Sequence, residues 1–377
     1  MKPLSRVRVI AVLFTLLFSG CSLLGSCDLF GLGGDDLLVM TYNLHNLFDD
    51  VYDGSEYSEF IPDDGGWGSD AYHARLRDFG RVIRGTRGSY GQGPDIIILT
   101  EVENQRVVED LRDRALGQRR YPVALATAVP GSAIQIGLLS RLPVEDVRLH
   151  AVYPHDDRTV RPILEAAVQP PGSDSLLHIF AGHWPSKIGG EHETEPYRLQ
   201  SAAVVMRRVR QLSKQDEHAM VLIAGDLNQT LPDNLDRCRV WQAQEREAEQ
   251  SGTPLALRSL MSACLYGSDQ LPAVPGKKPL FVTGNVHIAA DDPYIFFSPW
   301  SMTDFPGSYV FRDEWEDIDH FLLGNGLTGE QYWPVEYWVE SHDWMLTPSG
   351  YPRGYRPSQR SGLSDHLPIV LRLRPVQ

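Results

Sequence analysis

The chain is poor in cysteine, and its few cysteines form no metal-binding pattern. Only four occur among 377 residues, and two of them, Cys21 and Cys27, lie near the N-terminus. Cys238 and Cys264 remain for the rest of the chain, where a disulfide between them stays an open question. Because no Cys-x-x-Cys pair or Cys/His spacing is present, the sequence argues against a thiolate-bound zinc site.

The N-terminus also lacks an apolar run long enough to cross a membrane. Residues 9–18 are apolar, but a spanning helix needs about 20 such residues. The run follows three basic residues and precedes two small ones, an arrangement typical of a cleaved secretory signal over residues 1–20. The residues in question are Lys2, Arg6, Arg8, Ser19 and Gly20.

Residues 18–21, Phe-Ser-Gly-Cys, resemble a bacterial lipobox, in which the signal is cut before a cysteine that receives a lipid. We therefore expect lipidation of Cys21, a short tether over residues 21–36, and an extracytoplasmic, membrane-anchored lipoprotein of the bacterial cell envelope. Phe18 stands where leucine is usual. Cleavage before Cys27 and an uncleaved signal anchor therefore remain alternatives.

The chain is acidic, with a net charge of −14. Loss of the expected signal would make the mature protein more negative, because residues 1–20 contain three basic residues and no acidic ones. Phosphate backbones are held by lysine and arginine, so this balance disfavours strong non-specific nucleic-acid binding but allows a local basic groove. Serine-nucleophile hydrolysis is also disfavoured, because no Gly-x-Ser-x-Gly motif accompanies an Asp and a His in order.

An apolar content of 42% is enough to bury a core, and we expect one elaborated domain over residues 37–377. A long stretch with weak periodicity, residues 229–306, is interpreted as an insertion or a small helical subdomain. Short strand-like runs alternate with helix-like stretches and then arrive in pairs, which indicates a mixed α/β or α+β protein. The strand-like runs are residues 37–42, 95–100, 134–140, 163–168, 176–181, 220–224, 318–322 and 368–373, and the helix-like stretches are 75–84, 107–116 and 196–212.

Polar side chains recur where these predicted strands end, and loops at strand ends are where sites are built. Taken in order, six short motifs resemble those of the endonuclease/exonuclease/phosphatase superfamily, and the order is more specific than any one of them. They are Thr41-Tyr42-Asn43-Leu44, Leu99-Thr100-Glu101-Val102, Gly182-His183-Trp184-Pro185-Ser186, Gly225-Asp226-Leu227-Asn228, Ile318-Asp319-His320 and Ser364-Asp365-His366-Leu367-Pro368.

The resemblance covers nearly the whole chain after residue 37 and implies a DNase I-like fold, a four-layer α/β/β/α sandwich of two mixed β-sheets. It implies that Asp226 orients and deprotonates the attacking water and that Asn228 binds the transition state. His183 and His366 would contact the scissile phosphate. Asp319 would orient His366, whereas His320 would point to the opposite face of its strand by the two-residue period.

Phosphodiester hydrolysis requires a hard cation on the phosphate oxygens as well as an activated water. Mg²⁺ prefers oxygen ligands and keeps several waters, so we expect Asn43, Glu101 and Asp365 to bind it, with Mn²⁺ as a substitute.

Each residue also has a simpler interpretation. Asn43 and Asn228 could be turn residues, Glu101 could cap the helix expected at 107–116, and His183 could be a structural histidine. Ser364-Asp365 could form an Asx-type turn, and Asp319-His320 could lie on a solvated strand face.

The sequence thus predicts a monomeric Mg²⁺-dependent hydrolase that cleaves phosphodiester or phosphomonoester bonds. We expect an extracytoplasmic nuclease acting on DNA or RNA, because residues 183–187 resemble secreted bacterial members of the superfamily. The alternative is an esterase for phospholipid head groups or for sugar or inositol phosphates, favoured by the tether and the acidic surface. A surface-binding lipoprotein that has lost catalysis is the third hypothesis.

Overall fold

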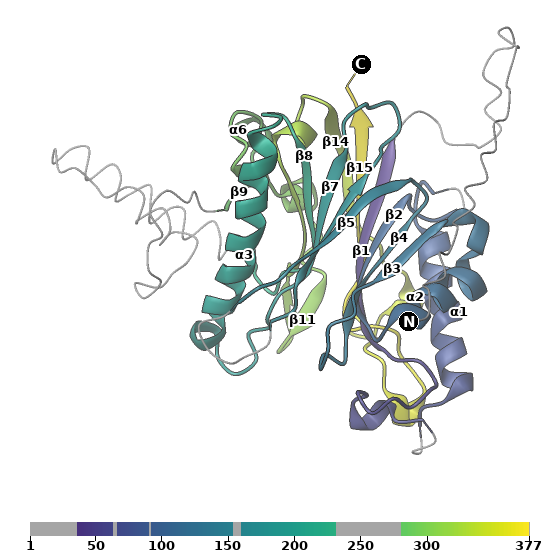
Figure 1. Ribbon diagram of the computed structural model, residues 1–377. Helices are drawn as coiled ribbons and strands as arrows, with labels where there is room; N and C mark the ends of the chain where they lie inside the picture. Colours follow the sequence, from purple (N-terminus) through teal and green to yellow (C-terminus); the bar gives the residue numbers. More distant parts are fainter. Residues whose placement is uncertain (1–35, 63–65, 90–91, 154–159, 231–279, 377) are drawn as a thin grey trace, which may run out of the picture.

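A computed structural model describes residues 36–62, 66–89, 92–153, 160–230 and 280–376. Two mixed β-sheets pack face to face, and helices cover their outer sides (Figure 1). The predicted four-layer sandwich is confirmed. The predicted signal, most of the tether and all four cysteines lie outside the described residues.

The first sheet has six strands in the order β14-β15-β1-β2-β4-β3. At its centre β1 runs parallel to β2 and antiparallel to β15. The strands are β1 (Leu37–Leu47), β2 (Ile96–Val102), β3 (Val123–Ala126), β4 (Gln135–Ser140), β14 (Tyr332–Val339) and β15 (Ile369–Pro375).

The second sheet has seven strands in the order β5-β6-β7-β8-β13-β10-β9, and a separate hairpin joins β11 to β12. Here β7 runs parallel to β8, and β13 is antiparallel to β8. The seven strands of this sheet are β5 (Val144–His150), β6 (Ile163–Val168), β7 (Leu177–His183), β8 (Met220–Asp226), β9 (Phe281–Thr283), β10 (Ile295–Phe297) and β13 (Asp319–Leu323), and the hairpin strands are β11 (Tyr309–Phe311) and β12 (Glu314–Glu316).

The helices lie on opposite flanks of the sandwich (Figure 1). On one flank are α1 (Ser69–Gly85) and α2 (Gln105–Asp110), which continues as a π-helical stretch, η2 (Leu111–Leu116); on the other is α3 (Glu191–Ser213). Short elements complete the fold: α6 (Val286–Ala290), η1 (Ser58–Phe60), η3 (Gln118–Arg120), η4 (Pro299–Met302), η5 (Asn325–Leu327), η6 (Asp343–Met345) and η7 (Pro357–Gln359). No helix in the described ranges is both long and apolar enough to cross a membrane.

The alternation of β1 explains how the sandwich positions polar groups. Tyr42 packs its ring against Phe79 of α1, with ring centroids 5.5 Å apart, so that face of the strand belongs to the helix layer. Asn43, the next residue, points the other way and reaches Asp226 at the end of β8 in the second sheet. A strand end in each sheet therefore contributes to one buried polar cluster.

All eight predicted strands form, with ends that shift by at most a few residues, except that β1 continues to Leu47. Strands β3, β5, β11, β12 and β14 were not predicted. Of the predicted insertion at 229–306, residues 231–279 lie outside the described part. Its last portion forms β9, α6, β10 and η4, and both strands extend the edge of the second sheet.

Candidate active site

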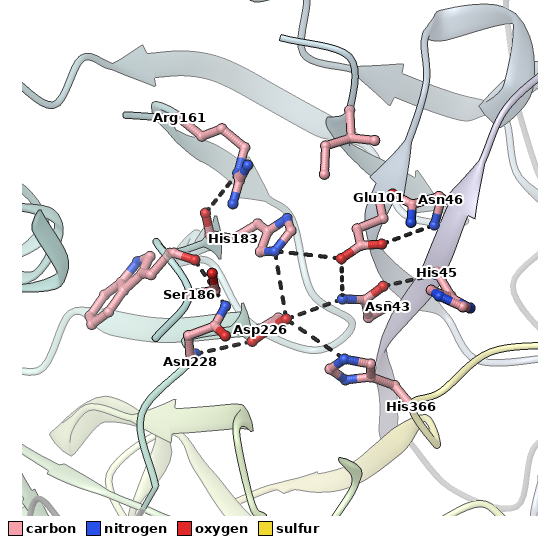
Figure 2. A network of polar contacts seen from close by, with 12 residues as sticks. Asn43, His45, Asn46, Glu101, Arg161, His183, Ser186, Asp226, Asn228 and His366 are labelled. Carbon is pink, nitrogen blue, oxygen red and sulfur yellow. Dashed lines mark hydrogen bonds and ion pairs between the residues drawn. The ribbon is translucent and has the colours of Figure 1, made fainter. Parts of the chain in front are cut away.

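The predicted site residues come from both sheets and meet at one end of the sandwich (Figure 2). Asn43 joins the sheets, since its Nδ2 donates hydrogen bonds to Glu101 Oε1 at 3.0 Å and to Asp226 Oδ2 at 3.1 Å. Its Oδ1 accepts from the backbone N–H of His45, as the turn interpretation expected. Asn43 therefore serves as a turn residue and as a bridge between two carboxylates.

The end of β1 is held in a strained backbone conformation around this bridge. His45, Asn46 and Glu101 all have positive φ angles, which non-glycine residues seldom adopt. Glu101 Oε2 accepts a hydrogen bond from Asn46 N, and the buried Arg75 donates to the carbonyls of residues 44, 45, 46 and 363. These contacts fix the direction of the Glu101 carboxylate.

Glu101 does not cap the helix that follows it. The capping residue is Asn104, whose side chain accepts a hydrogen bond from Val107 N at 3.1 Å. His320 is also absent from the site, as expected, because its Nε2 contacts the carbonyl of Gln229 at 2.6 Å.

His183 is buried and faces both carboxylates. Its Nε2 lies 3.6 Å from Asp226 Oδ2 and 3.8 Å from Glu101 Oε1, and its Nδ1 has no hydrogen-bond partner. Burial, with added repulsion from Arg161 and His366, holds the pKa of His183 well below its usual value. The imidazole is therefore neutral at pH 7.

His366 has the opposite character because a carboxylate holds it. Its Nδ1 lies 2.6 Å from Asp319 Oδ2, an oxygen that also accepts a hydrogen bond from Ser308 Oγ at 2.6 Å. Burial disfavours charge on the ring, but Asp319 outweighs it and raises the pKa of His366 to about 10. The ring is thus a cation whose free Nε2 lies 4.0 Å from Asp226 Oδ2.

Asp226 lies between the two histidines. Its Oδ1 accepts a hydrogen bond from Asn228 N at 3.0 Å, and the Asn228 side chain donates to the Trp184 carbonyl at 2.9 Å. Burial, together with the nearby charge of Asp319, raises the pKa of Asp226 to about 7. This carboxylate can take up and release a proton near neutral pH, as a general base requires.

Within this cluster, two groups of three side chains could hold a divalent cation: Glu101, His183 and Asp226, and Asp226, Asp319 and His366, with ligand atoms within 4.8 Å of one another in each group. The first fits better, because the second contains the charged imidazole. Glu101 and Asp226 offer the carboxylate oxygens that hard cations prefer, whereas Asn43 turns Nδ2 toward both and would add its Oδ1 only with the amide turned over.

The third predicted metal ligand, Asp365, belongs to neither group. Its carboxylate lies 3.7 Å from His45 Nε2.

The sequence interpretation missed Arg161 and Tyr309. Arg161, just before β6, donates from Nε to the His183 carbonyl at 3.0 Å and points its side chain toward the site (Figure 2). Tyr309 of β11 lies against His366, with ring centroids 4.6 Å apart. A lone arginine before a strand gives no local signal, because its role comes from packing between the sheets. Residues 307–309 do resemble a stretch of the superfamily, but that resemblance assigns Tyr309 no contact with His366.

The assembled residues, a carboxylate that can titrate near neutral pH between two imidazoles and beside a second carboxylate, are of the kinds that a metal-dependent phosphoesterase requires. The sequence matches the Endonuclease/Exonuclease/phosphatase family over residues 38–266, and the chain belongs to this family. Enzymes of this family use a divalent metal ion. A comparison with curated proteins gave no match.

Solved structures are similar to this chain at low sequence identity. A functionally unknown conserved protein from Enterococcus faecalis V583 is 12% identical with a TM-score of 0.50, over 90% of this chain and 100% of that one. Truncated Caenorhabditis elegans TDP2 is 13% identical with a TM-score of 0.48, over 91% and 99%. The human nocturnin catalytic domain is 12% identical with a TM-score of 0.48, over 90% and 94%.

Proposed function

We propose that the protein is an extracytoplasmic, Mg²⁺-dependent phosphodiesterase that cleaves nucleic-acid strands. The observation that carries the hydrolytic part is the position of Asp226, which lies within 4.0 Å of two imidazoles and whose pKa of about 7 suits a general base. Mg²⁺ held at Glu101 and Asn43, beside the Asp226 base, would polarise the phosphoryl oxygens and neutralise their charge.

The side chains then divide the work. Asp226 accepts the proton of the attacking water, and the His366 imidazolium, held by Asp319, donates a hydrogen bond to a phosphoryl oxygen from Nε2. Neutral His183 and the Asn228 amide orient the phosphate from the β7–β8 side. Arg161 adds a fixed positive charge where negative charge develops in the transition state.

Nucleic acid is favoured by the aromatic side chains next to this cluster. Tyr309 lies against His366, and Tyr57, 38% exposed, lies close enough to Glu101 and Arg161 for their charges to affect its pKa, which burial raises. Aromatic rings flanking a phosphate site can stack on bases on either side of a scissile bond. Stacking of this kind by the two tyrosines would favour a nucleic-acid substrate.

A second candidate is hydrolysis of phospholipid head groups or of sugar or inositol phosphates. It is favoured by the net charge of −14, which repels a polyanion, and by the lipobox-like residues 18–21.

A substrate panel separates the two candidates. Purified protein should hydrolyse bis(p-nitrophenyl) phosphate in Mg²⁺ and lose this activity in EDTA, with recovery on adding Mg²⁺ or Mn²⁺. Turnover of single- and double-stranded DNA and RNA is then compared with that of phospholipid vesicles and inositol phosphates, using Asp226→Asn protein as the control for contaminating nuclease. Full activity in chelator contradicts the metal mechanism, and preferential turnover of lipid or inositol phosphates favours the second candidate. Protein without hydrolytic activity would instead be a binding lipoprotein.

The location is tested by metabolic labelling with a fatty acid. Cys21→Ala protein should accumulate as an unlabelled precursor, whereas Cys27→Ala protein should be labelled like the wild type. Labelling that is lost in Cys27→Ala protein instead would show that the signal is cleaved before Cys27.

A further inference from the structure

A second group of carboxylates lies outside the catalytic cluster, where the segment after β1 meets the end of β2. Asp53, Glu56 and Glu103 each offer a ligand atom within 4.8 Å of the others. Like charges at this spacing repel one another unless a cation lies between them. No arginine, lysine or histidine in the described part of the chain forms an ion pair with any of the three; the nearby Arg106 pairs with Asp49 and Asp50 instead.

Glu103 gives the independent indication of a ligand. Its side chain is only 4% exposed, and although Oε2 accepts a hydrogen bond from Asp49 N at 2.6 Å, Oε1 is buried without a partner. Leaving a buried carboxylate oxygen unsatisfied is costly, and such groups are ordinarily hydrogen-bonded or bound to a metal. An ion between Glu103 and the two loop carboxylates would satisfy this oxygen.

The other two carboxylates are held in place by their own loop. Glu56 accepts hydrogen bonds from the backbone N–H groups of Asp53 and Gly54, at 2.6 and 2.9 Å, and Asp53 accepts one from Ser55 N at 2.8 Å. Gly54 adopts a φ of +91°, which lets the chain fold back over the cluster. Each carboxylate keeps lone pairs for a cation.

We propose that Asp53, Glu56 and Glu103 bind a calcium ion, at a site that shares no residue with the catalytic cluster. Ca²⁺ is favoured over Mg²⁺ because it accepts six to eight oxygens in flexible geometry at about 2.3–2.6 Å, whereas Mg²⁺ demands a near-ideal octahedron and keeps several waters. Asp53 is exposed, and waters can complete the shell. The proposal goes beyond the proposed activity and does not depend on it.

Such an ion would fasten the segment between β1 and α1 to the end of β2. That segment carries Tyr57, whose ring packs on Phe48 with centroids 5.3 Å apart, beside the catalytic cluster. The calcium site would therefore hold Tyr57 beside the catalytic cluster.

Calcium titration of the full chain by calorimetry, with Mg²⁺ at 5 mM to fill the catalytic position, tests the site. We expect one Ca²⁺ per chain with a Kd of roughly 0.1–1 mM, and an increase in thermal stability over the same range. Asp53→Asn should weaken Ca²⁺ binding at least tenfold, and Glu103→Gln should do the same where it folds. Glu59→Gln, which removes one exposed charge from the same segment outside the cluster, is the matched control.

Two results would overturn the proposal. One is the absence of Ca²⁺ binding and of a thermal shift at millimolar Ca²⁺, which would mean that Glu103 is a neutral buried acid. The other is equal Ca²⁺ affinity in the Asp53→Asn and Glu59→Gln proteins. Both readouts are independent of hydrolysis, so loss of the proposed activity would not affect them.

Discussion

Two buried clusters, each built around a carboxylate of the second sheet, contain the same kinds of side chain but differ in how they are connected. On its outer face Glu165 meets His150, His178 and Arg208; at its end Asp226 meets His183 and His366, with Arg161 nearby. Each combines a carboxylate, two imidazoles and a guanidinium.

Glu165 receives hydrogen bonds or close contacts from all its partners, at 2.6 Å from His150, 2.9 Å from His178 and 2.9 Å from Arg208. Burial opposes its charge, but these three partners hold the pKa of Glu165 below its usual value.

Asp226 has no comparable cationic partners at hydrogen-bond distance, because His183 and His366 lie 3.6 and 4.0 Å away. Burial and the charge of Asp319 therefore raise its pKa to about 7. The Glu165 cluster is closed, in that its carboxylate is paired with all three partners, and it stabilises the fold. The Asp226 cluster is open, in that its carboxylate is not paired with either imidazole at hydrogen-bond distance, and it keeps a titratable group available.

The largest expected effect is that of Asp226→Asn, which should lower kcat about 10⁴-fold because it removes the general base. In EDTA the same variant should be more stable than the wild type at pH 8. A carboxyl group whose pKa is raised from 3.8 to about 7 favours folding below pH 3.8, and this contribution is lost as the pH rises through 7. Phosphodiester turnover and thermal unfolding at pH 4 and pH 8 measure the two effects. A variant that loses both activity and stability at pH 8 would show that Asp226 is structural.

His366→Ala should lower kcat about 10³-fold with little change in KM, and Asp319→Ala should cost less. Because the two act as one unit through their 2.6 Å contact, the double variant should be scarcely worse than His366→Ala. Kinetic constants of the four proteins decide this. Fully multiplied penalties would show that Asp319 works separately, for example as a metal ligand.

Glu165→Gln should show the reverse pattern, with turnover within about twofold of the wild type and a free energy of unfolding lower by about 3 kcal/mol, because Arg208 loses its buried partner. Since the folded-state pKa of Glu165 is depressed, its contribution is present above pH 4.5 and lost as the pH falls further. Urea unfolding at pH 7 and pH 3.5 should therefore show a difference that shrinks in acid. A constant difference would assign the loss to packing.

The smallest expected effect is on the Mg²⁺ requirement of the Asp226 cluster. Glu101→Gln should raise the Mg²⁺ concentration for half-maximal activity roughly tenfold, because one charged oxygen ligand is lost. A Mg²⁺ titration of turnover measures it, with Glu165→Gln as the control carboxylate substitution. An unchanged titration would place the metal ligand elsewhere.

The strands that could be predicted from the sequence are those with apolar runs. The strands that could not be predicted include edge strands, whose sequences carry a weaker signal. The β5 sequence Val-Glu-Asp-Val-Arg-Leu-His is mostly exposed at the sheet edge, so burial imposes no apolar alternation on it. Strand β14 is also an edge strand and contains Pro334 beside a break in its pairing with β15. Edge strands depend on a neighbour for their hydrogen bonds, and the neighbour is not visible in local sequence.

The site residues, too, could be predicted only where they lie near strands with a clear pattern. Asn43, Glu101, His183 and Asp226 could be predicted to converge because each stands at the end of a strand of recognisable pattern. The hydrogen bond from Ser308 to Asp319 and the approach of Arg161 to His183 depend on how a hairpin and a loop pack. Neither packing has a local signature, so neither contact could be predicted.

The direction of β1 has a consequence for the reach of the enzyme. Asp36, just before β1, pairs with Arg374 at 2.9 Å, which anchors the start of the strand at the end opposite Asn43. The intervening strand covers about 20 Å at roughly 3.3 Å per residue. If Cys21 carries the proposed lipid, the tether joins the sandwich at the end remote from the catalytic cluster. The enzyme would then face away from its own bilayer and sample polymers in the surrounding fluid rather than the lipids beneath it.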